Sequence, residues 1–162
     1  MSCEIQPIHL RDRDAIGASV RELWGEELII VHGEIFRTND LPGLKAVENH
    51  DLLGFLHYII RGNVCEILTL ASLRKRQGIG TRLVQAVERI ARNQGCWKLK
   101  VTTTNDNLGA LAFYQHIGFL ITGQGLGLVD KARKLKPTIP EIGDHNIPIH
   151  DEIYLEKVLG IE

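Results

Sequence analysis

Two glycines, Gly78 and Gly80, stand where the chain could bind an anion, shortly after three basic residues at 74–76. The apolar run over residues 64–73 predicts a strand, and apolar residues at three- and four-residue spacing over 79–91 predict a helix. The first backbone N–H groups of such a helix are unpaired, and the positive end of its dipole favours an anion. Glycines let a ligand approach the backbone closely. The turn is therefore a candidate phosphate or pyrophosphate site, although a plain surface turn explains the same residues equally well.

The glycine turn matches neither of two common nucleotide-binding motifs. A P-loop ends in Gly-Lys-Ser/Thr, whereas Gly80 is followed by Thr81 and Arg82. A dinucleotide fingerprint needs a third glycine three residues later, where this chain has Leu83. The identity of the anion therefore depends on the rest of the chain.

Glu66 is the second residue that requires a chemical explanation. The run from Val64 to Leu70 is otherwise mainly apolar on both faces, as in a buried central strand. An unpaired buried carboxylate is unfavourable, and desolvation makes such a group a better proton acceptor. Glu66 is therefore either a general base or one half of a structural ion pair, for example with an arginine.

Composition limits the classes of function. The chain has 162 residues and a formal net charge of -1, and we expect one domain over 1–162. Near-neutral charge and few aromatic residues argue against nucleic-acid binding, and no segment approaches the roughly 20 apolar residues of a membrane span. Three cysteines without CxxC spacing predict neither a disulfide framework nor a zinc site, as expected for a cytoplasmic protein.

The order of predicted elements indicates a mixed α/β (α+β) fold, in which an antiparallel meander leads into alternating strands and helices. Residues 26–41 fit either an irregular connection or the mobile rim of a site, and the glycine-rich residues 123–127 predict a loop. The predicted strands cover 4–10, 45–48, 53–61, 64–71, 97–103, 119–123 and 153–159. The predicted helices cover 12–24 (capped by Asp12 or Asp14), 79–93, 107–116 and 128–135.

Two motifs together resemble the GNAT superfamily of acetyl-CoA-dependent N-acetyltransferases. The first is KRQGIG, from Lys75 to Gly80, with Lys75 at a position where the family usually has Gln or Arg. The second is NLGALAFYQHIGF, from Asn107 to Phe119. The resemblance implies a mostly antiparallel sheet of about six to seven strands flanked by about four helices. It also implies a splay between the strand ending near Leu73 and the strand at Trp97–Thr103.

The resemblance implies that acetyl-CoA is the co-substrate and that its pyrophosphate lies against the glycine turn. The backbone N–H groups that would bind it belong to Arg76, Gln77, Gly78, Ile79, Gly80 and Thr81, with charge added by Lys75.

The resemblance also implies positions for the rest of the donor. The pantetheine arm would pair with the strand edge that includes Leu68, Leu70 and Leu73, with Asn107 and Ala110 beside it. A backbone N–H near Leu70 would polarise the thioester carbonyl. Tyr114 would protonate the departing thiolate, while the alternative is a core tyrosine packed beside Phe113. Asn107 could equally cap a helix.

The acceptor is not determined by either motif, but two segments are expected to shape its pocket, 26–41 and 125–150. A small-molecule primary amine is favoured, a protein lysine or N-terminal amine is the alternative, and a non-catalytic acyl-CoA sensor is a rival of another class. The polar segment 144–152 contains His145 and His150 at spacing that matches no standard metal site, so no metal is expected there. The protein is expected to be a monomer or a homodimer.

Overall fold

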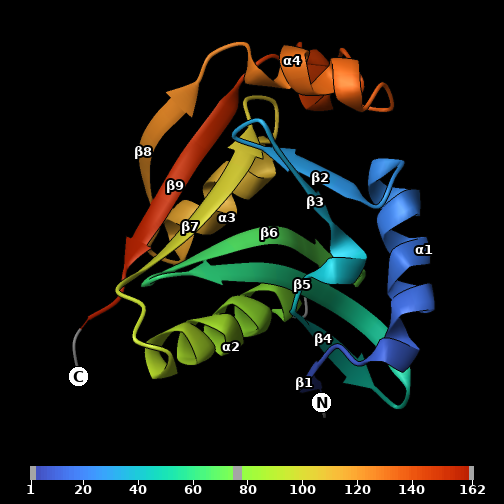
Figure 1. Cartoon of the computed structure of the whole chain (residues 1–162), viewed down its shortest axis with the longest axis vertical. Coiled ribbons are helices and arrows are strands. Elements are labelled where there is room, and N and C mark those ends of the chain that lie inside the picture. Colours follow the sequence, from blue (N-terminus) through green and yellow to red (C-terminus); the bar gives the residue numbers. More distant parts are fainter. Residues whose placement is uncertain (1–2, 75–77, 161–162) are drawn as a thin grey trace.

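A seven-stranded sheet forms the centre of the protein (Figure 1). The structure is a computed structural model and describes residues 3–74 and 78–160. All neighbouring strands in this sheet are antiparallel except β6 and β7, so the predicted mixed, mostly antiparallel sheet is confirmed. The strand order is β1 (Glu4–Pro7), β4 (Gly43–Glu48), β5 (Asp51–Arg61), β6 (Val64–Ser72), β7 (Lys98–Thr104), β9 (Glu152–Val158) and β8 (Leu120–Gly125).

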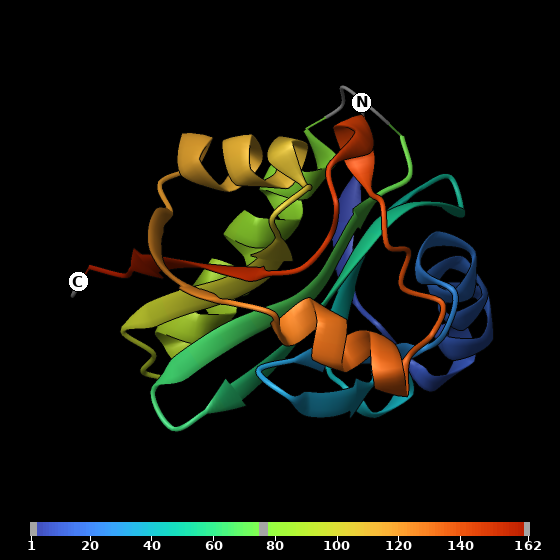
Figure 2. The same ribbon diagram turned by 90° about the horizontal axis from the view of Figure 1, so that it is seen from above.

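Helices cover both faces of the sheet. Figure 2 shows α2 and α3 on one face, and α1, α4 and a small hairpin on the other. The helices are α1 (Arg13–Trp24), α2 (Ile79–Asn93), α3 (Leu108–His116) and α4 (Leu128–Leu135). The described residues also contain three short 3-10 turns in the connections between elements: η1 (Leu10–Asp12), η2 (Thr38–Asp40) and η3 (Asp144–Asn146). No helix in the described part of the chain is both long enough and apolar enough to cross a bilayer.

The small hairpin consists of β2 (Leu28–Val31) and β3 (Glu34–Arg37), in a segment for which the sequence predicted no strand pair. Its turn residues His32 and Gly33 both have positive φ, at 54° and 76°. Two positive φ angles define the type I′ turn, whose twist matches that of the flanking strands. Thus the prediction of an irregular connection over 26–41 was wrong, because the segment contains an ordered strand pair. The alternative, that it borders a site, agrees with Ile29 to Val31 lining the cleft described below.

The sheet opens between β6 and β7. Their parallel pairing runs only from Val64–Lys98 to Ile67–Val101, although both strands continue beyond that point. Opposite this point, β5 pairs Tyr58 with Ile67 and His57 with Thr69, which makes Leu68 a bulged residue. The bulge bends β6 away from β7, and the predicted splay is confirmed.

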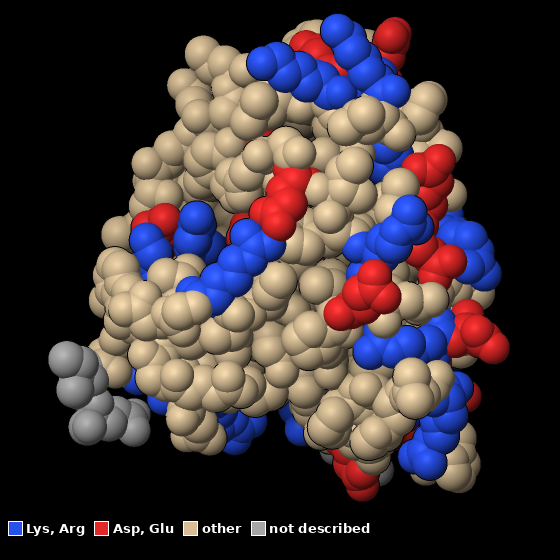
Figure 3. Space-filling model, in the orientation of Figure 1, with Lys and Arg blue, Asp and Glu red and all other residues tan. Residues whose placement is uncertain are grey.

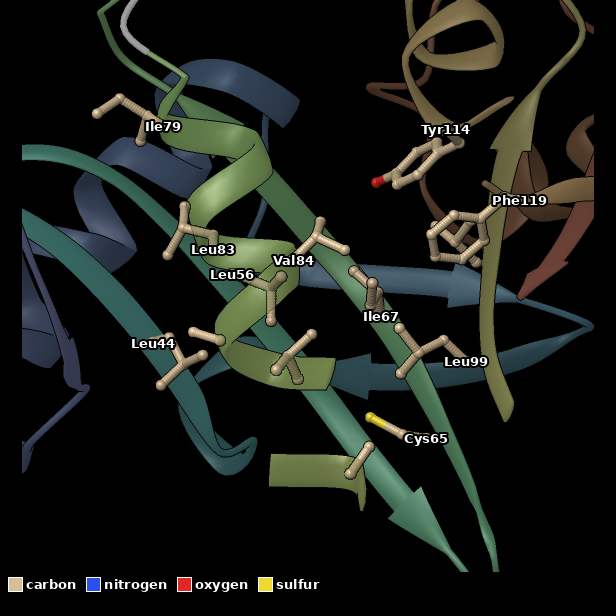
Figure 4. Packing of buried hydrophobic residues seen from close by; sticks show 14 of the residues in the cluster. Leu44, Leu56, Cys65, Ile67, Ile79, Leu83, Val84, Leu99, Tyr114 and Phe119 are labelled. Carbon is tan, nitrogen blue, oxygen red and sulfur yellow. The ribbon is translucent and has the colours of Figure 1, made fainter. Parts of the chain in front are cut away.

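Helix α2 packs its apolar stripe on the sheet next to this opening (Figure 4). Gly54 on β5 allows the close approach, because a Cβ there would lie 2.5 Å from Ala71 O and 2.8 Å from Ile79 Cγ2. The start of α2 is therefore fixed against the middle of the sheet. The fully buried side chains at this contact include Leu56, Ile67, Ile79, Leu83 and Leu99.

Several local predictions were wrong. Gly123 to Gly125 belong to β8 and pair with Tyr154, Ile153 and Glu152 of β9, because the partner strand stabilises glycines that read locally as a loop. Asp12 stands at the N-cap position of α1, but its side chain does not cap that helix. It accepts instead from His9 N and Lys45 Nζ, at 2.8 and 2.9 Å.

Candidate functional site

A cleft of about 740 Å³ lies at the opening between β6 and β7 and is lined from both faces of the sheet. Five of the residues that the sequence identified line it together, namely Leu68, Leu70, Asn107, Ala110 and Tyr114. They come from β6 and from the start and middle of α3. The splay therefore assembles residues that are about 40 positions apart in the chain into one site.

The N-terminus of α2 has the features of an anion site. Gly78 has φ of 67°, and among the described residues a Cβ there would meet nothing within 4 Å, so these residues leave the backbone open to a ligand. Gly78 has no side chain to cap the N–H groups of the first turn, which contains Ile79, Gly80 and Thr81. Gly80 packs against Phe113 of α3, since a Cβ would lie 3.2 Å from Phe113 Cζ. Lys75, Arg76 and Gln77 lie outside the described residues.

Two of the three residues predicted to form the pantetheine edge of β6 line the cleft. Leu68 and Leu70 are half-buried and face the cleft. Leu73 lies past the end of β6, is 39 % exposed, and donates its N–H to Leu53 O at 2.8 Å. Leu73 is therefore not among the residues that line the cleft.

Asn107 lines the cleft and caps α3 through its side chain, whose Oδ1 accepts from Ala110 N at 3.1 Å. The neighbouring Asp106 is buried and was not identified from the sequence. Its carboxylate accepts from Thr104 Oγ1 and from Asp144 N, at 2.5 and 3.1 Å. Asp106 thereby fastens the segment after α4 to the start of α3, and only contacts distant in sequence reveal this.

Tyr114 lies between the core and the cleft. Its ring packs edge-on against Phe113 and Phe119, at centroid distances of 5.1 and 5.3 Å. Figure 4 shows its hydroxyl directed away from Phe119, toward α2. Burial raises the pKa of this hydroxyl, so it is protonated at neutral pH. The side chain thus combines a core role with a protonated group at the cleft.

Glu66 does not line the main cleft. It faces an adjoining hollow of about 240 Å³ with Arg61, Lys98 and Lys100. The expectation that β6 is buried on both faces was wrong: burial alternates along it, and Glu66 is on the half-buried face. Its partner is a histidine rather than an arginine, with His32 Nε2 3.2 Å from Glu66 Oε2.

His32, at the tip of the hairpin, connects Glu66 with both sides of the opening. Its Nε2 lies 3.4 Å from Oγ1 of Thr102, which lines the main cleft. Its backbone N–H donates to both carboxylate oxygens of the buried Glu152, at 3.2 and 3.3 Å. Tyr154 donates to Glu152 at 2.9 Å, and burial together with Glu152 raises the pKa of Tyr154 to about 12. The hairpin tip is therefore held by fixed polar contacts.

The opposite part of the cleft is formed by α1, β2, α4 and the segment after α4. Residues of both segments that the sequence indicated for the acceptor pocket, 26–41 and 125–150, line it, whereas the contribution of α1 was not predicted. This part is mainly apolar, with Trp24, Ile29 and Ile139 among its residues. Lys136, at the end of α4, also lines it. Elsewhere the charges are mixed, and the face in Figure 3 shows acidic and basic side chains interspersed. In the described ranges no three His, Cys, Asp or Glu side chains gather as metal ligands would.

Comparison with known proteins agrees with this geometry. The family described as Acetyltransferase (GNAT) family matches residues 9–119. Protein YdhI of Bacillus subtilis is 42% identical over 137 residues, which is 84% of this chain and 86% of that protein. An IAA acetyltransferase from Bacillus cereus superposes with a TM-score of 0.72 at 23% identity, covering 98% of this chain and 100% of that one. A GNAT family acetyltransferase from Elizabethkingia anophelis with acetyl-CoA bound gives 0.69 at 24% identity, covering 97% and 98%. The chain therefore belongs to the GNAT family of acyl-CoA-dependent N-acetyltransferases.

Proposed function

We propose that the protein transfers an acetyl group from acetyl-CoA to a small-molecule primary amine by direct attack while both are bound. The observation that carries this proposal is the cleft at the opening between β6 and β7, which is accessible from both faces of the sheet. Its volume of about 740 Å³ is in the range of small-molecule sites. One face can receive the donor and the other the acceptor.

The donor side is formed by β6, α2 and α3. Residues that fit acetyl-CoA are the open N-terminus of α2 for the pyrophosphate and the free edge of β6 for the pantetheine. Asn107 and Ala110 border the same path. We place the backbone N–H near Leu70 at the thioester oxygen, where a donor stabilises developing negative charge. The structural neighbour from Elizabethkingia anophelis, which contains acetyl-CoA, supports this choice of co-substrate.

Acetyl-CoA supplies the acetyl group, and the protein positions and moves protons. The acceptor must be neutral to attack, so its ammonium first gives a proton to a base. We assign this role to Glu66 together with His32, since the Glu66–His32 pair lies beside Thr102 at the edge of the cleft. The new C–N bond forms as the C–S bond breaks, and Tyr114 donates its hydroxyl proton to the leaving sulfur. The nitrogen loses one proton on becoming an amide, and this proton, passed through solvent, restores the hydroxyl of Tyr114.

An acetyl-CoA turnover assay across a broad panel of amines tests the proposal, with thiol release and the mass of the acetylated product both recorded. The panel should contain amino acids, alkyl and aryl amines, aminoglycosides, and peptides with free N-termini or lysines. We expect acetylation of at least one small amine at a rate well above that of peptides. Acetylation of peptides alone would favour a protein acetyltransferase, and tight acetyl-CoA binding without any acetylated amine would favour an acyl-CoA sensor.

A further inference from the structure

We propose that the acceptor is an apolar amine that also carries a carboxylate, and that Lys136 binds this carboxylate. This inference rests on the proposed function, and it names the acceptor class that the same cleft would take.

The wall on the acceptor side selects for an apolar body. Leu23 and Trp24 at the end of α1, Ile29 and Ile30 of β2, and Ile139 after α4 all line this part of the cleft. Apolar surface of this kind favours alkyl or aryl groups by the free energy of removing them from water. A compact polyamine or a heavily hydroxylated sugar would leave this wall without a matching surface.

Charge on the acceptor side comes from one residue. Three charged side chains line the cleft within the described residues, namely Asp106, Asp144 and Lys136. The two aspartates lie at the start of α3 and in η3, and Asp106 already accepts two hydrogen bonds. Lys136 is on the opposite side, at the end of α4. The acceptor therefore meets a cation, and a second positive charge on it would be repelled.

Lys136 is a buried cation whose hydrogen bonding is incomplete. The residue is 5 % exposed, and its Nζ donates to Leu28 O at 2.8 Å, whereas an ammonium group has three N–H donors. Among the described residues no carboxylate lies within ion-pair distance of it. Burial lowers the pKa of Lys136, and Glu26 offsets only part of that effect. A buried ammonium that makes no direct ion pair is unfavourable even with Glu26 in its surroundings, so a ligand carboxylate would supply the direct partner that the described residues do not.

The competing explanation is structural: Lys136 could simply join the end of α4 to the hairpin through Leu28 O. The two explanations differ in their consequence for substrates. A structural contact affects all acceptors alike, whereas a carboxylate site affects only acceptors that carry a carboxylate.

Matched acceptor pairs that differ only in the carboxylate test the inference. Suitable pairs are leucine with 3-methylbutylamine and phenylalanine with 2-phenylethylamine. Each is assayed for kcat/KM with acetyl-CoA on the wild-type protein and on Lys136→Met, Lys136→Arg and the control Lys134→Met, which alters an exposed lysine of α4. Melting temperature and acetyl-CoA affinity are measured for each variant.

We expect the wild type to prefer the carboxylated member, and Lys136→Met to lower kcat/KM for that member roughly 10- to 100-fold while changing the plain amine less than about threefold. Lys136→Arg should keep the preference, and Lys134→Met should match the wild type. Equal or better use of the plain amines by the wild type would overturn the inference and leave the proposed function standing, and this result needs no variant to fold. An equal loss for both members in Lys136→Met would also overturn it. Acetylation of other small amines of the panel but of no member of these pairs would overturn the inference alone, whereas acetyl-CoA binding without acetylation of any amine would overturn the proposed function as well.

Discussion

Replacing Tyr114 with phenylalanine separates its two roles, because the substitution removes one oxygen and keeps the ring. The contacts to Phe113 and Phe119 at 5.1 and 5.3 Å depend on the ring alone. Within the described residues the hydroxyl makes no hydrogen bond that the folded chain would lose. Stability should therefore change by less than about 1 kcal/mol, and an increase is as consistent as a decrease.

Catalysis should respond much more strongly. A positioned general acid contributes about 10²- to 10⁴-fold, which corresponds to about 2.7 to 5.5 kcal/mol of transition-state stabilisation. We expect kcat to fall by about 100-fold or more in Tyr114→Phe, with the affinity for acetyl-CoA unchanged. Since burial raises the pKa of Tyr114, the wild-type rate should also persist to about pH 10 without an alkaline decline from this residue.

The assay is single-turnover acetyl transfer across pH 6 to about 10, alongside urea unfolding of the same protein. Tyr58→Phe is the matched control, because Tyr58 is a half-buried tyrosine packed against the same core but does not line the cleft. Its kcat should equal that of the wild type. A kcat of Tyr114→Phe within about threefold of the wild type, in a protein that still binds acetyl-CoA, would refute the role as general acid.

Three further perturbations test the base and the fold. Glu66→Gln should lower kcat/KM about 100-fold near neutral pH, as measured by thiol release, and the loss should become smaller at alkaline pH, where the acceptor amine is already neutral. A loss that is independent of pH would contradict the assignment as base. His57 is buried and neutral, and burial lowers its pKa from 6.5 to about 4. Its contribution to the free energy of unfolding is therefore present above pH 6.5 and is lost as the pH falls toward 4, because the unfolded chain binds the proton more readily. Urea unfolding of His57→Gln should therefore show less acid destabilisation than the wild type by roughly 3 kcal/mol, whereas exposed His116→Gln should keep the wild-type pH dependence. Asp12→Ala leaves the ammonium of Lys45 buried without its partner at 2.9 Å, so the free energy of unfolding should fall by about 3 kcal/mol. The double variant Asp12→Ala with Lys45→Met removes the unpaired charge and should restore part of this loss.

The parts of the fold that could be predicted from sequence are those whose signals are local. The periodicity after Gly80 is enough to predict α2, because one face of that helix carries the apolar residues that it buries. The meander of β4, β5 and β6 follows from apolar runs separated by turn residues, and Asn49 and His50 indeed adopt positive φ. Asn107 could be predicted as a cap because its partner, Ala110, is three residues away.

The unpredicted parts depend on contacts between distant residues. The hairpin tip is held by a hydrogen bond from His32 to Glu152, which is 120 positions away. Glu66 was assigned to a fully buried strand because its neighbours are apolar, but which face is covered depends on where β2 and β3 fold back. The burial of Lys136 in the cleft could not be predicted, because a lone lysine at a helix end normally points into solvent.

The contacts of His32 explain why the base and the opening of the sheet are coupled. Through one imidazole and one backbone N–H, His32 contacts Glu66 on β6, Thr102 on β7 and Glu152 on β9. These strands lie on either side of the gap that receives the substrates. Since β6 and β7 no longer pair beyond Ile67, the hairpin tip supplies fixed polar contacts across the gap where backbone hydrogen bonds cannot. The same residue therefore contacts the carboxylate that we assign as base and bridges the strands between which we propose that the acetyl group is transferred.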